Sequence, residues 1–130
     1  MSTGAAWALL TAADLREHVR PPGSAPADCD CARLVCPGWE SVSSPVGEPL
    51  LERLGSLRAE GDDEPTLTEQ HSEGSSYWSP NAPIATAFFP YNRCEVWLCR
   101  RCARGFLQYT EYGGYYVDQR LREIDPGRVV

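Results

Sequence analysis

Two groups of three cysteines constrain the fold of this chain more than any other feature of the sequence. The groups follow the patterns C-x-C-x4-C and C-x4-C-x2-C, and their members are Cys29, Cys31, Cys36, Cys94, Cys99 and Cys102. Tetrahedral metal sites in proteins are commonly built from two short cysteine segments that are distant in the sequence. We therefore expect the segments 29–36 and 94–102 to meet in the folded chain, each forming a cysteine knuckle.

The segment "CRRCARGF" carries the stronger of the two metal signals. A two-residue spacer lets both thiolates point at one centre, while backbone N–H groups of the turn donate to the sulfurs. A small residue soon after the second cysteine eases the tight turn. Gly105 lies three residues beyond Cys102, somewhat later than in the tightest knuckles.

Four thiolates complete a tetrahedral site, so six cysteines leave two over or form a binuclear cluster. The spacing favours Cys99 and Cys102 first and Cys29 and Cys31 second. The alternates are Cys36 and Cys94. Cys94 lies five residues before Cys99 on an expected strand, so their side chains should face opposite ways. We predict a structural zinc ion held by four cysteines, with Cys94 as a small buried apolar residue.

Three other uses of these cysteines remain open at this stage. They are buried reduced thiols or disulfides, a binuclear or iron–sulfur site, and a redox role for the C-x-x-C segment. Arg100 and Arg101 would lower a thiolate pKa, but no long helix follows the motif as it would in a thioredoxin-like unit.

The length and composition predict an α+β fold: a small zinc-ribbon-like antiparallel sheet with an N-terminal helix and long irregular connections. The 130 residues suffice for a single domain, expected over 1–130. With 11 glycines and 11 prolines, mostly outside the periodic segments, the connections need pinning to the core.

A helix is predicted over residues 12–20. Thr11 and Asp14 have the spacing of a capping box, and Pro21 with Pro22 would end the helix. Further on, we expect a short helix ending near Leu54, followed by a hairpin of "LGSLR" and "TLTEQ" around an acidic turn.

The C-terminal third reads as strands joined by tight turns. Residues 94–99 alternate as a strand, and 106–118 are predicted to form a hairpin around the Gly113–Gly114 turn. Asp118 would then cap a short final helix carrying Leu121 and Ile124. Aromatic residues of the preceding connection are expected to anchor it to the core; they are Tyr77, Trp78, Phe88, Phe89 and Tyr91.

The charge distribution argues against broad adhesion to nucleic acid or to anionic lipid. Of the net charge of −6, residues 1–90 contribute −8 (5 Arg, 13 acids) and residues 91–130 contribute +2 (7 Arg, 5 acids). No basic residue precedes the apolar run at 5–10, which is too short to span a membrane. We therefore expect a cytoplasmic protein without membrane contact, in which cysteine clusters more often hold metal.

Two resemblances accompany these patterns. "CDCARLVC" resembles the cysteine segment trailing the SET domain of histone methyltransferases, which implies that this spacing chelates a tetrahedral ion. The run "YWSPNAPIATAFFPYNRCEVWLCRRCARGFLQYTEYGGYYVDQRLR" is similar to a block of small uncharacterised bacterial proteins. That likeness implies a bacterial, cytoplasmic, cysteine-bearing domain and brings no activity with it; the absence of lysine also hints at a bacterial origin.

Three functional hypotheses follow, of which a protein-binding or regulatory module is favoured. Such a module would bind its partner through the acidic N-terminal part of the chain, which includes residues 60–73, and through the tyrosines of the hairpin. These tyrosines are Tyr109, Tyr112, Tyr115 and Tyr116. Their alternative role is cross-strand pairing within the sheet.

The second hypothesis is a nucleic-acid-binding zinc ribbon that uses arginines around the second knuckle: Arg93, Arg100, Arg101 and Arg104. The third is a small enzyme using His71 and nearby carboxylates, although no nucleophile motif accompanies that histidine. His18 is expected on the helix surface. An enzyme is the less favoured reading, and no catalytic residue is assigned.

Overall fold

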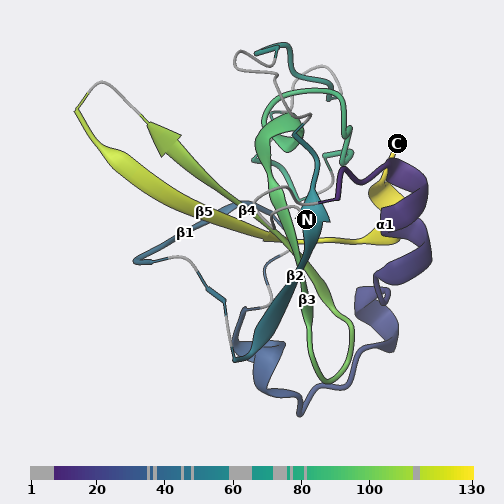
Figure 1. Ribbon diagram of the computed structural model, residues 1–130. Coiled ribbons are helices and arrows are strands. Elements are labelled where there is room, and N and C mark those ends of the chain that lie inside the picture. The colour runs from purple at the N-terminus through teal and green to yellow at the C-terminus, as the bar shows by residue number, and fades with distance from the viewer. Residues whose placement is uncertain are drawn as a thin grey trace, which may run out of the picture.

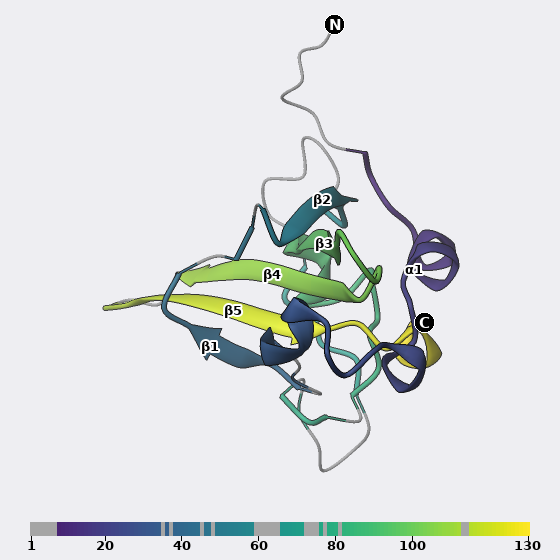
Figure 2. The ribbon, with the colours of Figure 1, turned by 90° about the horizontal axis from the view of Figure 1, so that it is seen from below.

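The chain folds as an α+β structure built on a five-stranded antiparallel sheet (Figure 1), which confirms the predicted class. The computed structural model describes residues 8–34, 36, 38–44, 46–47, 49–58, 66–71, 76, 78–80, 82–112 and 115–130. The strands are β1 (Glu40–Val42), β2 (Leu51–Ser56), β3 (Glu95–Cys99), β4 (Gly105–Tyr112) and β5 (Val117–Glu123). Their order across the sheet is β1-β5-β4-β3-β2, as Figure 2 shows.

The predicted N-terminal helix is present as α1 (Ala12–His18), and its capping box forms as expected. The Thr11 hydroxyl accepts from the backbone N–H of Asp14, whose carboxylate accepts from the N–H of Thr11 at 2.8 Å. The helix buries Leu15, and Val19 follows it in extended conformation. Its boundary falls two residues before the predicted end, because the chain must straighten ahead of Pro21.

Short 3-10 turns complete the described secondary structure. They are η1 (Pro22–Ser24), η2 (Asp30–Leu34), η3 (Tyr91–Arg93) and η4 (Pro126–Arg128). The turns η1 and η2 lie between α1 and β1, and η4 contacts α1 near the C-terminus.

The part of the sheet around Phe106 and Leu107 is covered on both faces. Neighbouring residues of a strand point to opposite faces, and accordingly Leu107 belongs to one apolar cluster while Phe106 belongs to another. The first cluster packs α1 and the C-terminal segment against the sheet, through Leu15, Val19, Ile124 and Val129 among others. The second cluster contains Leu51, Phe106, Leu121 and five of the six cysteines.

The long connection before β3 is anchored to the first face, partly by the aromatic residues named from the sequence. Tyr91 is fully buried beside Trp39 and accepts a hydrogen bond from the buried Arg122 guanidinium at 2.6 Å. Arg122 also donates to the carbonyl of Ala82 at 2.9 Å. Trp78 stays at the surface under the guanidinium of Arg120, and Tyr77 lies outside the described residues.

The short helix predicted to end near Leu54 is wrong, because residues 51–56 form strand β2 against β3. A bulge between Arg53 and Gly55 shifts the alternation, so Leu51 joins the cysteine face while Leu54 and Leu57 join the opposite one. That three-residue spacing imitates a helical stripe. Gly55 is required here, since a Cβ at this position would lie 2.5 Å from the Ala8 carbonyl oxygen.

The hairpin proposed for "LGSLR" and "TLTEQ" does not form as a pair of strands in the described residues. Around 66–70, the structure shows one bridge, between Glu69 and Phe89. The acidic turn at 59–65 lies outside the described residues.

The final helix predicted after Asp118 is wrong as well, since 117–123 form β5. Seven residue pairs join β5 to β4, so the predicted hairpin exists, while its Gly113–Gly114 turn lies outside the described residues. Cross-strand pairing overrides the local capping preference. Asp118 instead accepts a hydrogen bond from Ser41 at 2.8 Å, which links β1 to β5, and one from Arg120 Nε of its own strand at 2.9 Å.

A connecting segment between β1 and β2 crosses the cysteine face, because these two strands lie at opposite edges of the sheet. The Gln108 side chain in the central strand holds this segment. Its amide donates to the Val46 carbonyl at 2.6 Å, and its oxygen accepts from the Val46 N–H at 2.8 Å.

Asp118→Asn tests the link between β1 and β5. The hydrogen bonds from Arg120 and Ser41 lower the pKa of Asp118 in the folded protein. The carboxylate therefore stabilises the fold at pH values above about 3.9, the pKa of an aspartate in the unfolded chain. This stabilisation is lost as the pH falls through the pKa of Asp118 in the folded protein. We expect a lower melting temperature for the variant at neutral pH and a difference that shrinks as the pH falls below about 3.9. A loss that does not change with pH would show that the charge is not responsible.

Candidate metal centre

Four buried cysteine sulfurs, from Cys29, Cys31, Cys99 and Cys102, lie within 4.8 Å of one another. The Sγ atoms of Cys29 and Cys99 are 3.5 Å apart, and those of Cys31 and Cys102 are 3.4 Å apart. Zn–S bonds of about 2.3 Å place the sulfurs of a tetrahedron about 3.8 Å apart. The same pairs are too far apart for disulfide bonds of about 2.05 Å, and all six cysteines are free thiols. The arrangement fits a tetrahedral metal ion, and its four residues are those that the spacing favoured.

The second knuckle is the turn between β3 and β4. Cys99 ends β3, and its N–H donates to the Arg104 carbonyl at 2.8 Å, which closes the turn around Cys102. The N–H of Ala103 donates back to the Cys99 carbonyl at 3.0 Å. These two bonds fix both cysteines at one end of the hairpin.

The first knuckle is supplied by η2 and the residue before it. Cys31 lies in η2, and the N–H of Ala32 donates to the Cys29 carbonyl at 2.9 Å. Leu34 of this turn packs against the cluster of Phe106 and Leu121 on the sheet. The turn, dark blue in Figure 2, thus brings its two thiols to the sulfurs of the hairpin.

Backbone N–H groups surround the sulfurs of the second knuckle. Burial raises the pKa of Cys99, but hydrogen bonds from the N–H groups of Arg101 and Cys102 outweigh it and lower the pKa to about 7. Burial raises the pKa of Cys102 despite the Arg104 N–H, and burial also raises that of Cys31. N–H donors aimed at sulfur stabilise thiolates, which are the form that binds metal.

The turn requires a left-handed residue directly after Cys102, and Ala103 occupies that position with φ of 65°. The sequence suggested that the small residue easing the turn was Gly105. Gly105 has another role: a Cβ there would lie 2.8 Å from both Val19 methyl groups. The glycine therefore permits close packing of the chain after α1, and the alanine carries the strain of the turn.

Arg20 fastens the segment after α1 to the same turn. Its N–H donates to the Ala103 carbonyl at 3.0 Å, and its Nε donates to the Cys102 carbonyl at 2.7 Å. The segment after the helix is thus attached directly to the second knuckle.

The two alternates, Cys36 and Cys94, lie outside the four-sulfur group. Cys36 Sγ contacts the Leu34 carbonyl at 3.2 Å and the Leu121 carbonyl at 3.7 Å, and burial raises its pKa to about 11. Cys94 belongs to the apolar cluster on the opposite face and donates to the Pro90 carbonyl at 3.2 Å. Burial raises its pKa as well. Both environments suit protonated thiols.

The arginines near the second knuckle have different environments. Arg104 is buried and faces Glu123, with 3.4 Å between Nε and Oε2. Arg100 lies 3.8 Å from Glu52, and Arg101 lies 3.7 Å from Asp30. The Arg93 guanidinium donates to the Thr66 carbonyl and lies over the Phe89 ring. The sequence could not predict the ion pair of Arg104, because Glu123 is distant in the sequence and comes close only through the pairing of β4 with β5.

Both histidines lie beside a carboxylate. His71 Nε2 is 2.9 Å from Glu69 Oε1, and His18 Nε2 is 3.8 Å from Glu17 on the surface of α1. The pair at His71 specifies no reaction by itself, because a general base acts only on a proton within hydrogen-bond reach.

No family model, curated protein or solved structure matches the chain. The resemblances drawn from the sequence therefore stay predictions. Within the residues that the structure describes, there is no helix with the length and apolar character needed to cross a membrane.

Replacing one cysteine of the group should remove a bound metal ion. We expect about one ion per chain in native mass spectrometry of the wild type, and none in Cys102→Ser, which should also lose its cooperative thermal transition because metal affinity contributes to folding. Cys36→Ser is the matched control, since a hydroxyl can keep the contacts of this thiol to carbonyl oxygens. Retention of metal by Cys102→Ser, or its loss from Cys36→Ser, would contradict the assignment.

Two substitutions test the knuckle turn. Ala103→Gly should stabilise the fold by about 1 kcal/mol, because glycine adopts positive φ without the Cβ clash. Gly105→Ala should destabilise it, because the new methyl group meets Val19. Chemical denaturation of the metal-loaded protein measures both, and changes of the same sign in the two variants would refute this division of roles.

Proposed function

We propose that the protein is a small zinc-stapled domain that serves as a protein-binding or regulatory module in the cytoplasm. The group of four buried sulfurs supports the zinc site. The exposed apolar end of the β4–β5 hairpin supports the binding role.

Zinc is the ion that the donor set favours. Four thiolates in a tetrahedral arrangement suit zinc or an iron–sulfur centre, and zinc sites with four protein ligands are closed to substrate. The β3–β4 knuckle would form one half of a zinc-ribbon-like site, with η2 supplying the other half. Such an ion stabilises the fold and leaves binding to other surfaces. A reducing compartment would keep the thiols available for it.

The hairpin of β4 and β5 extends away from the rest of the molecule (Figure 1). Pairing of β3 with β4 runs from Leu98–Gly105 to Glu95–Gln108, so residues 109–112 continue beyond it. Large side chains near the end of the hairpin are exposed: Tyr112 by 76%, Tyr115 by 104%, Tyr116 by 56% and Val117 by 61%. Tyrosine is enriched in protein interfaces, where it supplies contact area and a polar group. Tyr109, by contrast, is buried against Trp39, so the predicted tyrosine surface begins at Tyr112.

The nucleic-acid hypothesis has weaker support in the geometry. Burial of Arg104 removes one of its four arginines from the surface, and Arg100 and Arg101 each lie within 4 Å of an acid. A continuous basic surface is what phosphate binding needs. The enzyme hypothesis rests on the His71–Glu69 pair and stays a prediction.

The binding role is tested by comparing partners of the wild type with those of a hairpin variant. We expect the triple variant Tyr112→Ala, Tyr115→Ala, Tyr116→Ala to keep its metal and melting temperature and to lose a protein that copurifies with the wild type. Binding must then be reproduced with the two purified proteins, with an affinity at least tenfold weaker for the variant, as is typical of interface residues that cost more than 1.4 kcal/mol.

Leu67→Ala is the matched control, because this leucine is 70% exposed and lies outside the hairpin. A partner that both variants lose equally, or one that neither variant loses, would contradict binding through the hairpin. Loss of copurification without reproduction by purified components would contradict it as well.

A further inference from the structure

A pocket of about 280 Å³ lies beside the metal centre, and nothing in the proposed function uses it. Its walls are small apolar residues of the segment that carries η1 and η2, namely Pro22, Ala25, Ala27 and Ala32. The remaining lining residues are Arg104, which follows the second knuckle, and Glu123, at the end of β5. The pocket therefore combines apolar walls with one cation and one anion.

The two charged side chains are more than nine-tenths buried, with 5% of the Arg104 side chain and 4% of the Glu123 side chain exposed. They lie on the same face of the sheet, because Phe106, two residues after Arg104, pairs directly with Glu123. Their approach at 3.4 Å is an ion pair without an aligned hydrogen bond. In the described part of the chain, Arg104 Nε and Glu123 Oε2 have no hydrogen-bond partner.

This arrangement is costly for a purely structural pair. Buried charges are compensated only when their remaining donors and acceptors are satisfied. An apolar pair would fill the same position at lower cost if packing were its purpose. Arg104 Nε and Glu123 Oε2 face each other, and both side chains line the pocket. A ligand with complementary groups would therefore gain hydrogen bonds there to the other polar atoms of the guanidinium and the carboxylate.

The chemistry of the ligand follows from the charge balance. The pair is neutral overall, so a carboxylate or an ammonium ligand would leave one buried charge opposed by a like charge. A primary carboxamide carries an acceptor oxygen and a donor nitrogen on the same carbon atom and has no net charge. We propose that this pocket binds the primary carboxamide of a small molecule or of a glutamine side chain, whose oxygen accepts from Arg104 and whose N–H donates to Glu123.

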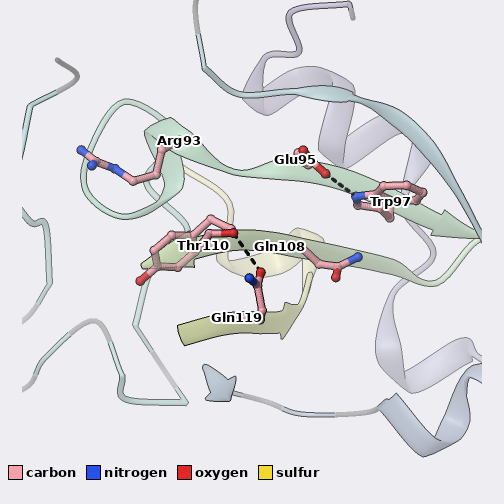
Figure 3. Close-up of a pocket in the computed structure, with 7 residues that line it drawn as sticks. Arg93, Glu95, Trp97, Gln108, Thr110 and Gln119 are labelled. Carbon is pink, nitrogen blue, oxygen red and sulfur yellow. Dashed lines mark hydrogen bonds between the residues drawn. The ribbon is translucent and has the colours of Figure 1, made fainter. Parts of the chain in front are cut away.

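A second concave surface differs from this pocket in that its polar side chains already have hydrogen-bond partners. The groove along β3, β4 and β5 in Figure 3 is also lined by polar side chains, but these are partnered. Trp97 donates to Glu95 at 3.0 Å, Thr110 donates to Gln119 at 2.8 Å, and Gln108 holds Val46. A ligand entering that groove would have to break existing hydrogen bonds, whereas one entering the Arg104–Glu123 pocket would complete missing ones.

The test is a titration of the intact protein, in its isolated metal state, followed by NMR of alanine methyl groups. Propanamide should shift the Ala25, Ala27 and Ala32 signals saturably, with a Kd on the order of 1 mM for so small a probe. N,N-dimethylpropanamide lacks the N–H donor and should bind at least tenfold more weakly. Propionate and propylammonium should bind more weakly too. Equal binding of the dimethyl or charged probes, or no saturable shift, would overturn the proposal.

A wall variant separates this site from non-specific binding. Ala25→Leu fills the pocket without altering the ion pair and should abolish the propanamide shifts of the remaining pocket alanines. Ala13→Leu, at an exposed position of α1, is the matched control and should leave them unchanged. Undiminished binding by Ala25→Leu would place the amide elsewhere and refute the assignment.

The source of the carboxamide is distinguished by a second pair of probes. N-acetylglutamine methylamide presents the side-chain amide on a peptide backbone, and free propanamide presents it alone. At least tenfold tighter binding of the glutamine probe would assign the pocket to a peptide ligand, and the reverse order would assign it to a small amide. Binding of neither probe would overturn the proposal.

Discussion

The approach of four sulfurs joins two parts of the chain that are distant in the sequence. Cys29 meets Cys99 across 70 positions of sequence, and Cys31 meets Cys102 across 71. Among the described residues between α1 and β1, the secondary structure consists of short 3-10 turns, whose own hydrogen bonds cannot hold them against a sheet. The sulfurs, together with Arg20 on the knuckle carbonyls, fix this segment. The pocket beside Arg104 exists because the segment is held there.

The sheet has an inner end that is covered on both faces and an outer end that is not. Near Phe106 and Leu107 the faces are covered by the cysteine segment and by α1 with its neighbours. Towards Tyr112 and Val117 the two strands continue beyond these layers. One pair of strands thus provides both a rigid attachment to the proposed metal centre and a projecting surface. A small domain obtains both properties in this way without a larger core.

Much of the site followed from sequence, because cysteine spacing and capping are local properties. The capping box of Thr11 and Asp14, the strand at Glu95–Cys99 and the meeting of the four favoured cysteines agree with the pattern. The predictions of secondary structure were wrong where pairing with a distant strand, and not the local sequence, determines the conformation. Leu51, Leu54 and Leu57 have a spacing that is typical of a helix, but a bulge in β2 lets a strand bury them on its two faces. Asp118 has the chemistry of a helix cap but lies on a paired strand. The burial of Arg104 depends on a partner brought close by strand register, which no local pattern reveals.

The strand order also has a consequence for the route by which the chain acquires its structure. The strands β3, β4 and β5 are consecutive hairpins, whereas β1 and β2 flank them at opposite edges with partners far ahead in the sequence. Local hairpins close faster than distant pairings, because loop closure costs entropy. A ribosome releases the N-terminus first, so α1, β1, β2 and the first pair of favoured cysteines emerge before any of the strands that receive them. Ordering of the whole molecule therefore awaits synthesis of its last third, and the first thiols stay exposed to cellular metal and oxidants until then.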